Sequence, residues 1–135
     1  MDTLLVVDGA NVVGSTPDGW WRDRRGAAER LRDRLVAVAP TGVACWPGPL
    51  EIVLVVEGAA RGVSSVPGVR VESADGSGDD LITELAASAA GAGQPCVVVT
   101  ADRGLRERVT EHGARCAGPR SVLRARCSGG TTSAD

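Results

Sequence analysis

Acidic residues follow each of the three strongest apolar runs in this sequence: Asp8, Glu57 and Asp102 lie at or beside the ends of these runs. A further acidic pair, Asp79 and Asp80, stands at the start of a helical pattern. Carboxylates that a fold brings close together repel one another, so they either take up protons or share a cation. Hard oxygen ligands of this kind suit Mg²⁺ or Mn²⁺. Such metals lower the pKa of a bound water and stabilise a developing phosphate charge, and this is the chemistry that we expect.

The elements that must position these acids follow from hydrophobic periodicity. Three apolar runs rich in strand formers predict buried strands, and two weaker ones predict a short edge strand and a brief strand near the end. Amphipathic patterns predict four helices between and after them. The predicted strands cover residues 4–7, 51–56, 69–71, 96–99 and 114–117, and the predicted helices cover 22–38, 79–90, 103–111 and 120–126. The first helix is expected to end at Pro40 and Gly42.

This alternation of strands and helices predicts βαβ units, and therefore a mainly parallel sheet inside a three-layer α/β/α sandwich. In open parallel sheets, sites form beyond the carboxyl ends of the strands. The acids after the three strong strands are therefore expected to meet at one rim, and Asp79 and Asp80 to face the same rim. Residues 1–127 are expected to form a single domain, followed by a disordered tail over 128–135.

Each acid also has a purely structural explanation. Asp8-Gly9 is typical of a turn after a strand, and Asp79, Asp80 and Asp102 could satisfy free amides at helix starts. A glutamate at a strand end, as at Glu57, is often merely exposed. For Asp80 and Asp102 taken singly, capping explains the residue at least as well as catalysis. The agreement of three strands is what favours a functional site.

Polar, basic and aromatic residues near these acids are candidates for positioning and binding. Asn11 follows Asp8 by three residues, where its amide could position an acid, a water or a phosphate, or stabilise a turn. Trp20-Trp21 precedes a run of arginines, and together they could stack bases and bind phosphates, or one tryptophan could pin the loop to the core. The arginines of this run are Arg22, Arg24 and Arg25.

Composition narrows the function classes. The 135 residues are 43% hydrophobic with a net charge of −2, and all basic residues are arginines. Charge is nevertheless segregated: residues 22–34 hold six arginines against three acids, 72–84 hold five acids and no base, and 102–126 hold seven arginines against three acids. This could place cations in the middle and phosphates at the sides, although on charge alone ordinary solvated helix faces are the favoured explanation.

Several kinds of site are disfavoured. The four cysteines form no CxxC pair, so buried reduced thiols are expected rather than zinc ligands. The motifs of a P-loop, of a dinucleotide site after the first strand and of a serine-hydrolase elbow are absent. No apolar run is long enough for a membrane helix, and Asp2 stands where a signal peptide has positive charge, so a cytoplasmic protein is expected.

Four segments together resemble the NYN domain, a branch of the PIN-like nuclease superfamily, and are most similar to its YacP-like bacterial members. The resemblance extends from residue 4 to about residue 123. The segments are Val-Val-Asp-Gly-Ala-Asn-Val-Val-Gly at 6–14, Val-Val-Glu-Gly-Ala at 55–59, Gly-Asp-Asp-Leu-Ile at 78–82 and Val-Thr-Ala-Asp-Arg-Gly-Leu at 99–105. The Asp-Gly-x-Asn block alone is moderately specific, and the later blocks in order make the resemblance strong.

The resemblance implies a PIN-like, Rossmann-like fold and metal-dependent ribonuclease chemistry with Mg²⁺ or Mn²⁺. It implies that Asp8, Asp79 and Asp102 hold the metal, with Asp80 as a supporting ligand. Asn11 and Thr100 would orient the site, and we expect Asn11 to be one of the catalytic residues. Glu57 lies where many relatives carry Asp, and its longer side chain could still reach the metal.

The predicted activity is endonucleolytic hydrolysis of RNA phosphodiester bonds. RNA is the implied partner, with the ribosome or other RNA-processing partners as further candidates, and no membrane is involved. The residues expected to bind the substrate are Arg22, Arg24, Arg25, Arg103, Thr100 and Trp21. The alternative is a non-catalytic RNA-binding or regulatory module that keeps the same fold.

Overall fold

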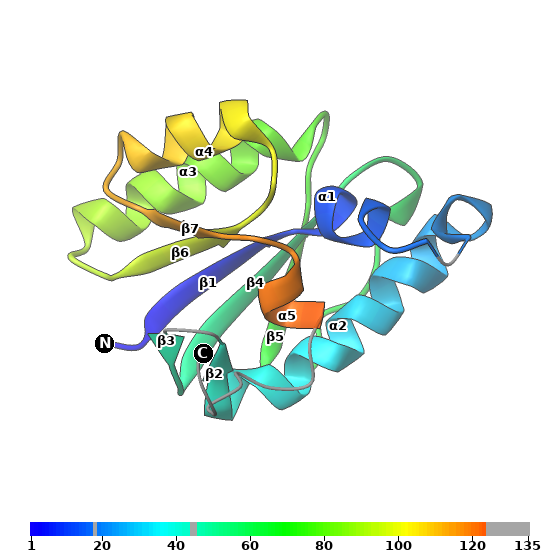
Figure 1. The fold of residues 1–135 in the computed structure, drawn as a ribbon, viewed down its shortest axis with the longest axis horizontal. Helices are drawn as coiled ribbons and strands as arrows, with labels where there is room; N and C mark the ends of the chain where they lie inside the picture. The colour runs from blue at the N-terminus through cyan, green and yellow to red at the C-terminus, as the bar shows by residue number, and fades with distance from the viewer. Residues whose placement is uncertain (18, 44–45, 124–135) are drawn as a thin grey trace.

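A five-stranded parallel sheet forms the centre of the molecule, with the strand order β5-β4-β1-β6-β7 (Figure 1). The computed structural model describes residues 1–17, 19–43 and 46–123. The strands are β1 (Thr3–Asp8), β4 (Leu50–Val56), β5 (Val69–Ser73), β6 (Cys96–Val99) and β7 (Arg115–Ala117). The predicted parallel sheet is thus confirmed, and the weak run at 69–71 is the edge strand β5.

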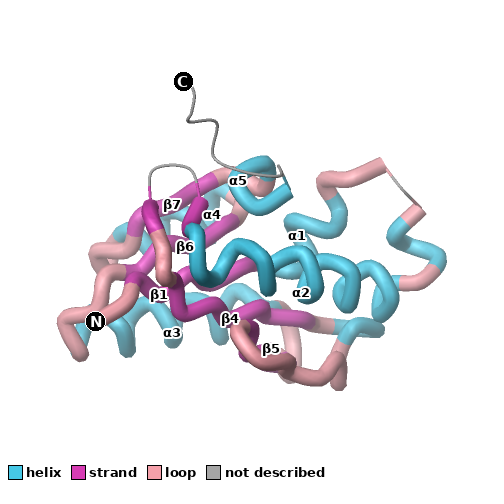
Figure 2. Tube along the Cα trace, turned by 90° about the horizontal axis from the view of Figure 1, so that it is seen from below, coloured by secondary structure: helices cyan, strands magenta, loops and turns pink. Residues whose placement is uncertain are grey.

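Helices cover both faces of the sheet, which confirms the predicted three-layer sandwich. Helices α2 and α5 pack on one face, and α3 and α4 pack on the other (Figures 1 and 2). The α-helices are α1 (Gly9–Gly14), α2 (Arg24–Thr41), α3 (Gly78–Gly91), α4 (Arg103–Thr110) and α5 (Arg120–Leu123). Two 3₁₀ helices, η1 (Trp20–Arg22) and η2 (Gly58–Ala60), and a small antiparallel pair, β2 (Gly42–Val43) with β3 (Trp46–Pro47), complete the described elements.

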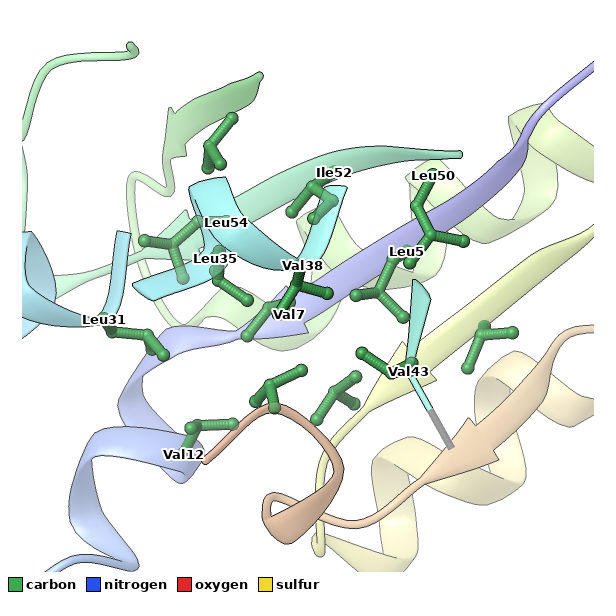
Figure 3. Close-up of a cluster of buried hydrophobic side chains, with 14 of the residues drawn as sticks. Leu5, Val7, Val12, Leu31, Leu35, Val38, Val43, Leu50, Ile52 and Leu54 are labelled. Carbon is green, nitrogen blue, oxygen red and sulfur yellow. The ribbon is translucent and has the colours of Figure 1, made fainter. Parts of the chain in front are cut away.

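The core is divided into two layers by the alternation of side chains along the strands. Leu5 and Val7 of β1 face α2, where they pack with residues such as Leu35 (Figure 3). Leu4 and Val6 of the same strand face α3 and α4. Successive side chains of a strand point to opposite faces, so a strand covered by helices on both sides must be apolar throughout. This is why the three strong strands are readable as continuous apolar runs.

The end of α2 differs from the prediction. The helix continues through Pro40 to Thr41 and ends at Gly42. A proline in the last turn removes only one backbone donor, whereas Gly42 adopts φ 96°, ψ −179°, a conformation that essentially only glycine tolerates. The glycine, and not the proline, therefore ends this helix. Residues 124–126 of the last predicted helix, and the predicted tail, lie outside the described residues.

The thiols that the structure describes agree with the predicted buried, reduced state. Cys96 is buried, Cys116 is half-buried, and neither forms a disulfide. Burial raises the pKa of Cys96 to about 11, with the neighbouring Cys116 adding to the effect. Cys45 and Cys127 lie outside the described residues. None of the helices in the described part of the chain is both long and apolar enough to cross a membrane.

The strand order creates a switch point between β1 and β6. The chain leaves β1 toward α1 and α2 on one face of the sheet, and it leaves β6 toward α4 on the other face (Figure 1). The connections therefore diverge beyond the carboxyl ends of these two neighbouring strands. In open α/β sheets this divergence opens the crevice in which ligands bind.

Candidate active site

Asp8, the last residue of β1, is a carboxylate almost withdrawn from solvent. Only 6% of the surface of this residue is exposed. Oδ2 accepts a hydrogen bond from Thr100 Oγ1 at 2.9 Å, and Oδ1 accepts one from the Asn11 backbone N–H at 3.4 Å. Burial raises the pKa of Asp8 above its usual value, the two hydrogen bonds oppose this, and the charges of Asp79 and Glu57 add to the rise. A buried carboxyl group with a raised pKa and specific hydrogen-bond partners is typical of functional sites.

The loop after β6 is tied to Asp8 by a short hydrogen-bond network. Thr100 is fully buried, and its Oγ1 both donates to Asp8 and accepts from the Asp102 backbone N–H at 3.1 Å. Asn11 joins the network from α1, because its Oδ1 accepts the Ala101 backbone N–H at 2.9 Å. These contacts link residues about ninety positions apart, and they confine Asp8 and Asp102 to the same end of the sheet.

Asp102 also has the structural role that its position predicts. Its Oδ1 accepts the Leu105 backbone N–H at 3.0 Å and so caps α4. The loop before it is held from the other side by Arg106, whose Nε donates to the Thr100 carbonyl at 2.8 Å. Capping and a functional position thus coincide at Asp102. The cap fixes one carboxylate oxygen and leaves the other for a ligand.

Asp79 lies in the first turn of α3, and its pKa is influenced by the charges of neighbouring acids. Burial raises its pKa, and the charges of Asp102 and Glu57 raise it further, against the opposing charge of Arg108. The hydrogen bond from the Gly78 backbone N–H to Glu57 holds the residue before Asp79 against the loop that carries Glu57.

Glu57 connects the end of β4 to the start of α3. Its Oε1 accepts the Gly78 backbone N–H at 2.7 Å. Gly78 is buried, and a Cβ there would lie 3.0 Å from this oxygen and 3.2 Å from Val55. The glycine therefore permits the close approach of α3 to Glu57, and the contact brings the first turn of α3, including Asp79, to the rim.

The four acids share one rim without forming a closed metal cage. Within residues 1–17, 19–43 and 46–123, no group of three Asp, Glu, His or Cys side chains is arranged to hold a metal ion. The chemistry of the donors fits a hard dication, because all are carboxylates and two have raised pKa values caused in part by their neighbours. Like charges with no cation between them gain nothing by closer approach. The residues thus fit Mg²⁺ or Mn²⁺ by donor type, and they would have to draw closer together to share one ion.

Asp80 lies apart from this network. Its side chain is 81% exposed and pairs with Arg108, with Nη2 to Oδ1 at 2.9 Å. Helix α3 is capped by Ser77 and not by either aspartate, since Ser77 Oγ accepts the Asp79 backbone N–H at 3.3 Å. The expectation that an acid caps this helix was therefore wrong, and nothing in the hydrogen bonding of Asp80 links it to Asp8.

The two tryptophans and the arginines after them form a stacked group next to the rim. Trp20 and Trp21 meet edge to face, with ring centroids 6.2 Å apart. The guanidinium carbon of Arg24 lies 5.3 Å from the Trp20 ring centroid, and that of Arg22 lies 5.8 Å from the Trp21 centroid. Trp21 is 55% exposed. This group has the chemistry that stacks bases and contacts phosphates.

Two of the residues predicted to bind substrate also support the structure. Arg25 donates to the carbonyls of Arg61 and Gly62, at 2.7 and 3.1 Å, and so holds the loop after η2. Thr100 is 0% exposed and donates to Asp8, which is the contact of a positioning residue. Substrate binding by these two residues stays a prediction. Arg103 is exposed at the start of α4, directly after Asp102, where a phosphate could reach it.

Sequence reasoning named both tryptophans as candidates for stacking but missed one pair of supporting contacts. Of the two tryptophans, Trp20 lines a pocket beside the rim. Arg106 and Gly78 support the site through contacts to Thr100 and Glu57. Nothing in the local pattern distinguishes these residues, because their partners are distant in sequence or belong to the backbone.

The metal-free protein is expected to lose stability at this site as the pH rises. The folded-state pKa values of Asp8 and Asp79 are raised from 3.8. The stability that these two groups contribute is therefore fully present below about pH 4, and it is lost as the pH rises through the raised values. Thermal unfolding with a chelator present measures this. The free energy of unfolding of Asp8→Asn minus that of wild type should increase from pH 4 to pH 7. A difference independent of pH would contradict the raised pKa of Asp8.

Comparisons with known proteins support the fold alone. No protein-family model and no curated protein matches the chain. Solved structures that are similar include Rae1 (YacP) from Bacillus subtilis as the W164L mutant, with a TM-score of 0.73, 20% identity and coverage of 92% of this chain and 74% of that one. For Rae1 (YacP) from Bacillus subtilis without this mutation, the TM-score is 0.71, the identity 21% and the coverage 92% of this chain and 72% of that one. The predicted resemblance is therefore confirmed at the level of structure: this chain has the α/β fold of Rae1 (YacP).

Proposed function

We propose that this chain is a metal-dependent ribonuclease that hydrolyses RNA phosphodiester bonds at the acidic rim beyond β1, β4 and β6. The observation that carries the proposal is the convergence of Asp8, Asp79 and Asp102 from three separate segments at the switch point of the sheet. The likeness to Rae1 supports it through the fold. Carboxylates gathered in one place repel one another, and binding a dication would relieve that repulsion.

The residues of the chain have distinct roles in this proposal. Asp8, Asp79 and Asp102 would hold Mg²⁺ or Mn²⁺, which when bound would activate water and stabilise phosphate charge. Thr100 and Asn11 position Asp8 and the loop of Asp102 through the hydrogen bonds described above. Arg103 is available to the phosphate, and the Trp20–Arg24 group to the flanking nucleotides. Glu57 orients the start of α3, with Asp80 at the outer side as a supporting acid.

Purified protein incubated with single-stranded RNA is expected to cleave it internally with Mn²⁺ or Mg²⁺ and to leave it intact with excess chelator. Gel analysis of end-labelled RNA measures both. Cleavage that persists in chelator would reject the metal requirement. Cleavage in none of the metals, with RNA still bound, would reject the ribonuclease proposal altogether.

One observation favours the second candidate, a non-catalytic RNA-binding or regulatory module. In the described part of the chain the acids do not form a ready three-ligand group. A module of this kind would bind RNA with a strong dependence on salt and would not change its length. The cleavage gel and a gel shift on the same samples distinguish the two.

A further inference from the structure

A pocket opens directly beside the acidic rim, between α1, α2 and η2. It holds about 140 Å³, far more than one water molecule needs. Its lining includes Ala10, Val13, Trp20, Arg24, Glu57 and Ala60. Gly9 and Ala10, which directly follow Asp8, line the pocket, and so does Glu57, whose Oε1 accepts the backbone N–H of Gly78 next to Asp79. The pocket therefore lies next to the proposed active site.

The walls of the pocket suit a flat aromatic heterocycle. Aliphatic side chains from α1, α2 and β4 supply apolar contact, and Trp20 supplies an aromatic surface. Arg24, whose guanidinium carbon lies 5.3 Å from the Trp20 ring centroid, adds a planar cation that stacks on rings and attracts phosphate. Stacking of bases on aromatic and arginine planes is how proteins hold the unpaired bases of RNA.

Glu57 supplies the polar group that would discriminate among bases. Its Oε1 is engaged by the Gly78 N–H, and among the described residues no hydrogen bond is made by Oε2. An ionised carboxylate accepts hydrogen bonds and cannot donate them. It therefore favours a base with an exocyclic amino group, such as adenine or cytosine. Uracil carries a carbonyl oxygen in place of that amino group and offers a carboxylate only its ring N3–H, which lies between two carbonyl oxygens.

We propose that this pocket binds one unpaired base of the RNA substrate next to the scissile phosphate and prefers an amino-bearing base to uracil. The inference rests on the proposed function, because it treats the acidic rim as the place where the phosphate lies. It assigns Trp20 and Arg24 to the stacking of that base and Glu57 to its selection. Glu57 is thus a specificity residue rather than a metal ligand.

The test measures binding without metal, so that it does not depend on cleavage. Short single-stranded oligomers of adenylate, cytidylate and uridylate are titrated into wild-type protein in chelator, and binding is followed by fluorescence anisotropy. We expect adenylate or cytidylate to bind about tenfold more tightly than uridylate. Trp20→Ala should lose about tenfold in affinity for the preferred oligomer. Glu57→Gln can still accept from Gly78 and can also donate, so it should bring uridylate close to the preferred oligomer.

Trp21→Ala is the matched comparison, because Trp21 is adjacent and exposed but does not line the pocket. It should weaken binding of all three oligomers to a similar extent and leave their ratio unchanged. Equal wild-type affinities for the three oligomers would overturn the proposal. The proposal would also be overturned if Glu57→Gln, shown to be folded by its thermal transition, kept the wild-type preference for adenylate or cytidylate over uridylate.

Cleavage assays on the same variants separate this proposal from the proposed function. Base preference without any cleavage would reject the ribonuclease and leave the pocket standing. Cleavage by wild type with no base preference in binding would support the ribonuclease and reject the base-binding pocket. Loss of cleavage by Glu57→Gln with an unchanged base preference would identify Glu57 as a metal ligand and overturn its assignment here.

Discussion

Replacing Asp8 by Asn is expected to lower metal-dependent RNA cleavage on the order of a thousandfold, because the contribution of a bound metal to transition-state charge is several kcal/mol. Asp8 is the most buried acid of the rim, and its side chain is oriented by Thr100 and Asn11. Asn is of nearly the same shape and keeps one oxygen to accept from Thr100, while its NH2 group replaces the oxygen that accepts the longer bond from the Asn11 N–H. The substitution therefore removes the charge and keeps the shorter of the two hydrogen bonds. Initial rates on end-labelled RNA with Mn²⁺ measure the loss.

The same variant should be folded and at least as stable as wild type in the absence of metal. The raised pKa of Asp8 means that its ionised form is disfavoured by burial and by neighbouring acids, so an uncharged side chain relieves a cost. In wild type, added Mn²⁺ should raise the thermal transition by mass action, and in Asp8→Asn this increase should largely disappear. A variant that cleaves at the wild-type rate, or one that responds to Mn²⁺ as wild type does, would remove Asp8 from the site.

The parts of the fold that could be predicted from sequence are those whose signal is local and long. Strands buried on both faces, such as β4 and β6, are continuous apolar runs that each follow a proline and end before a polar residue, so their positions are predicted to within a residue. The helix α3 has both a clear apolar stripe and glycines at its end. The parallel order of the sheet follows from these elements, since crossover helices leave few arrangements.

The parts that could not be predicted depend on contacts between distant segments. Helix α1 has six residues, too few to be stable alone, and it forms because Asp8 caps it and Gly9 lets it start against β4. A Cβ at Gly9 would lie 2.6 Å from the Val55 carbonyl oxygen. The short η1, η2 and β2–β3 elements are likewise too short to leave a periodic pattern.

The candidate site shows the same division. The three strand-end acids were placed at one rim by topology alone, because carboxyl ends of parallel strands share an edge. The direction of each acidic side chain depends on its hydrogen-bond partners. The partner of Glu57 is the backbone N–H of Gly78, which is 21 residues away and belongs to a residue without a side chain, so the sequence pattern does not predict the contact. Arg25 has contacts that its charge could not predict: its guanidinium donates to two backbone carbonyls 36 and 37 residues away.

Replacing Thr100 by Val is expected to reduce cleavage by about ten- to a hundredfold, which is the usual effect of losing a residue that orients a metal ligand. The Thr100 hydroxyl is the only side chain that donates to Asp8 among the described residues, and it also accepts the Asp102 N–H. Valine has nearly the same shape, so the core around it is preserved. The loss leaves a buried oxygen of Asp8 and an amide without partners, which should cost about 1–3 kcal/mol of stability.

Thr100→Ser separates positioning from bulk packing. Serine restores the hydroxyl but removes a methyl group, so it should recover most of the cleavage even where its stability remains below that of wild type. Because Thr100 has no exposed surface, the defect of Thr100→Val should lie in kcat rather than in KM. It should also shift the acidic limb of the pH–rate profile upward, since the Thr100 hydrogen bond lowers the pKa of Asp8. A change confined to KM would instead mean that Thr100 contacts the RNA, and the network that links β1 to the loop after β6 would lose its assigned role.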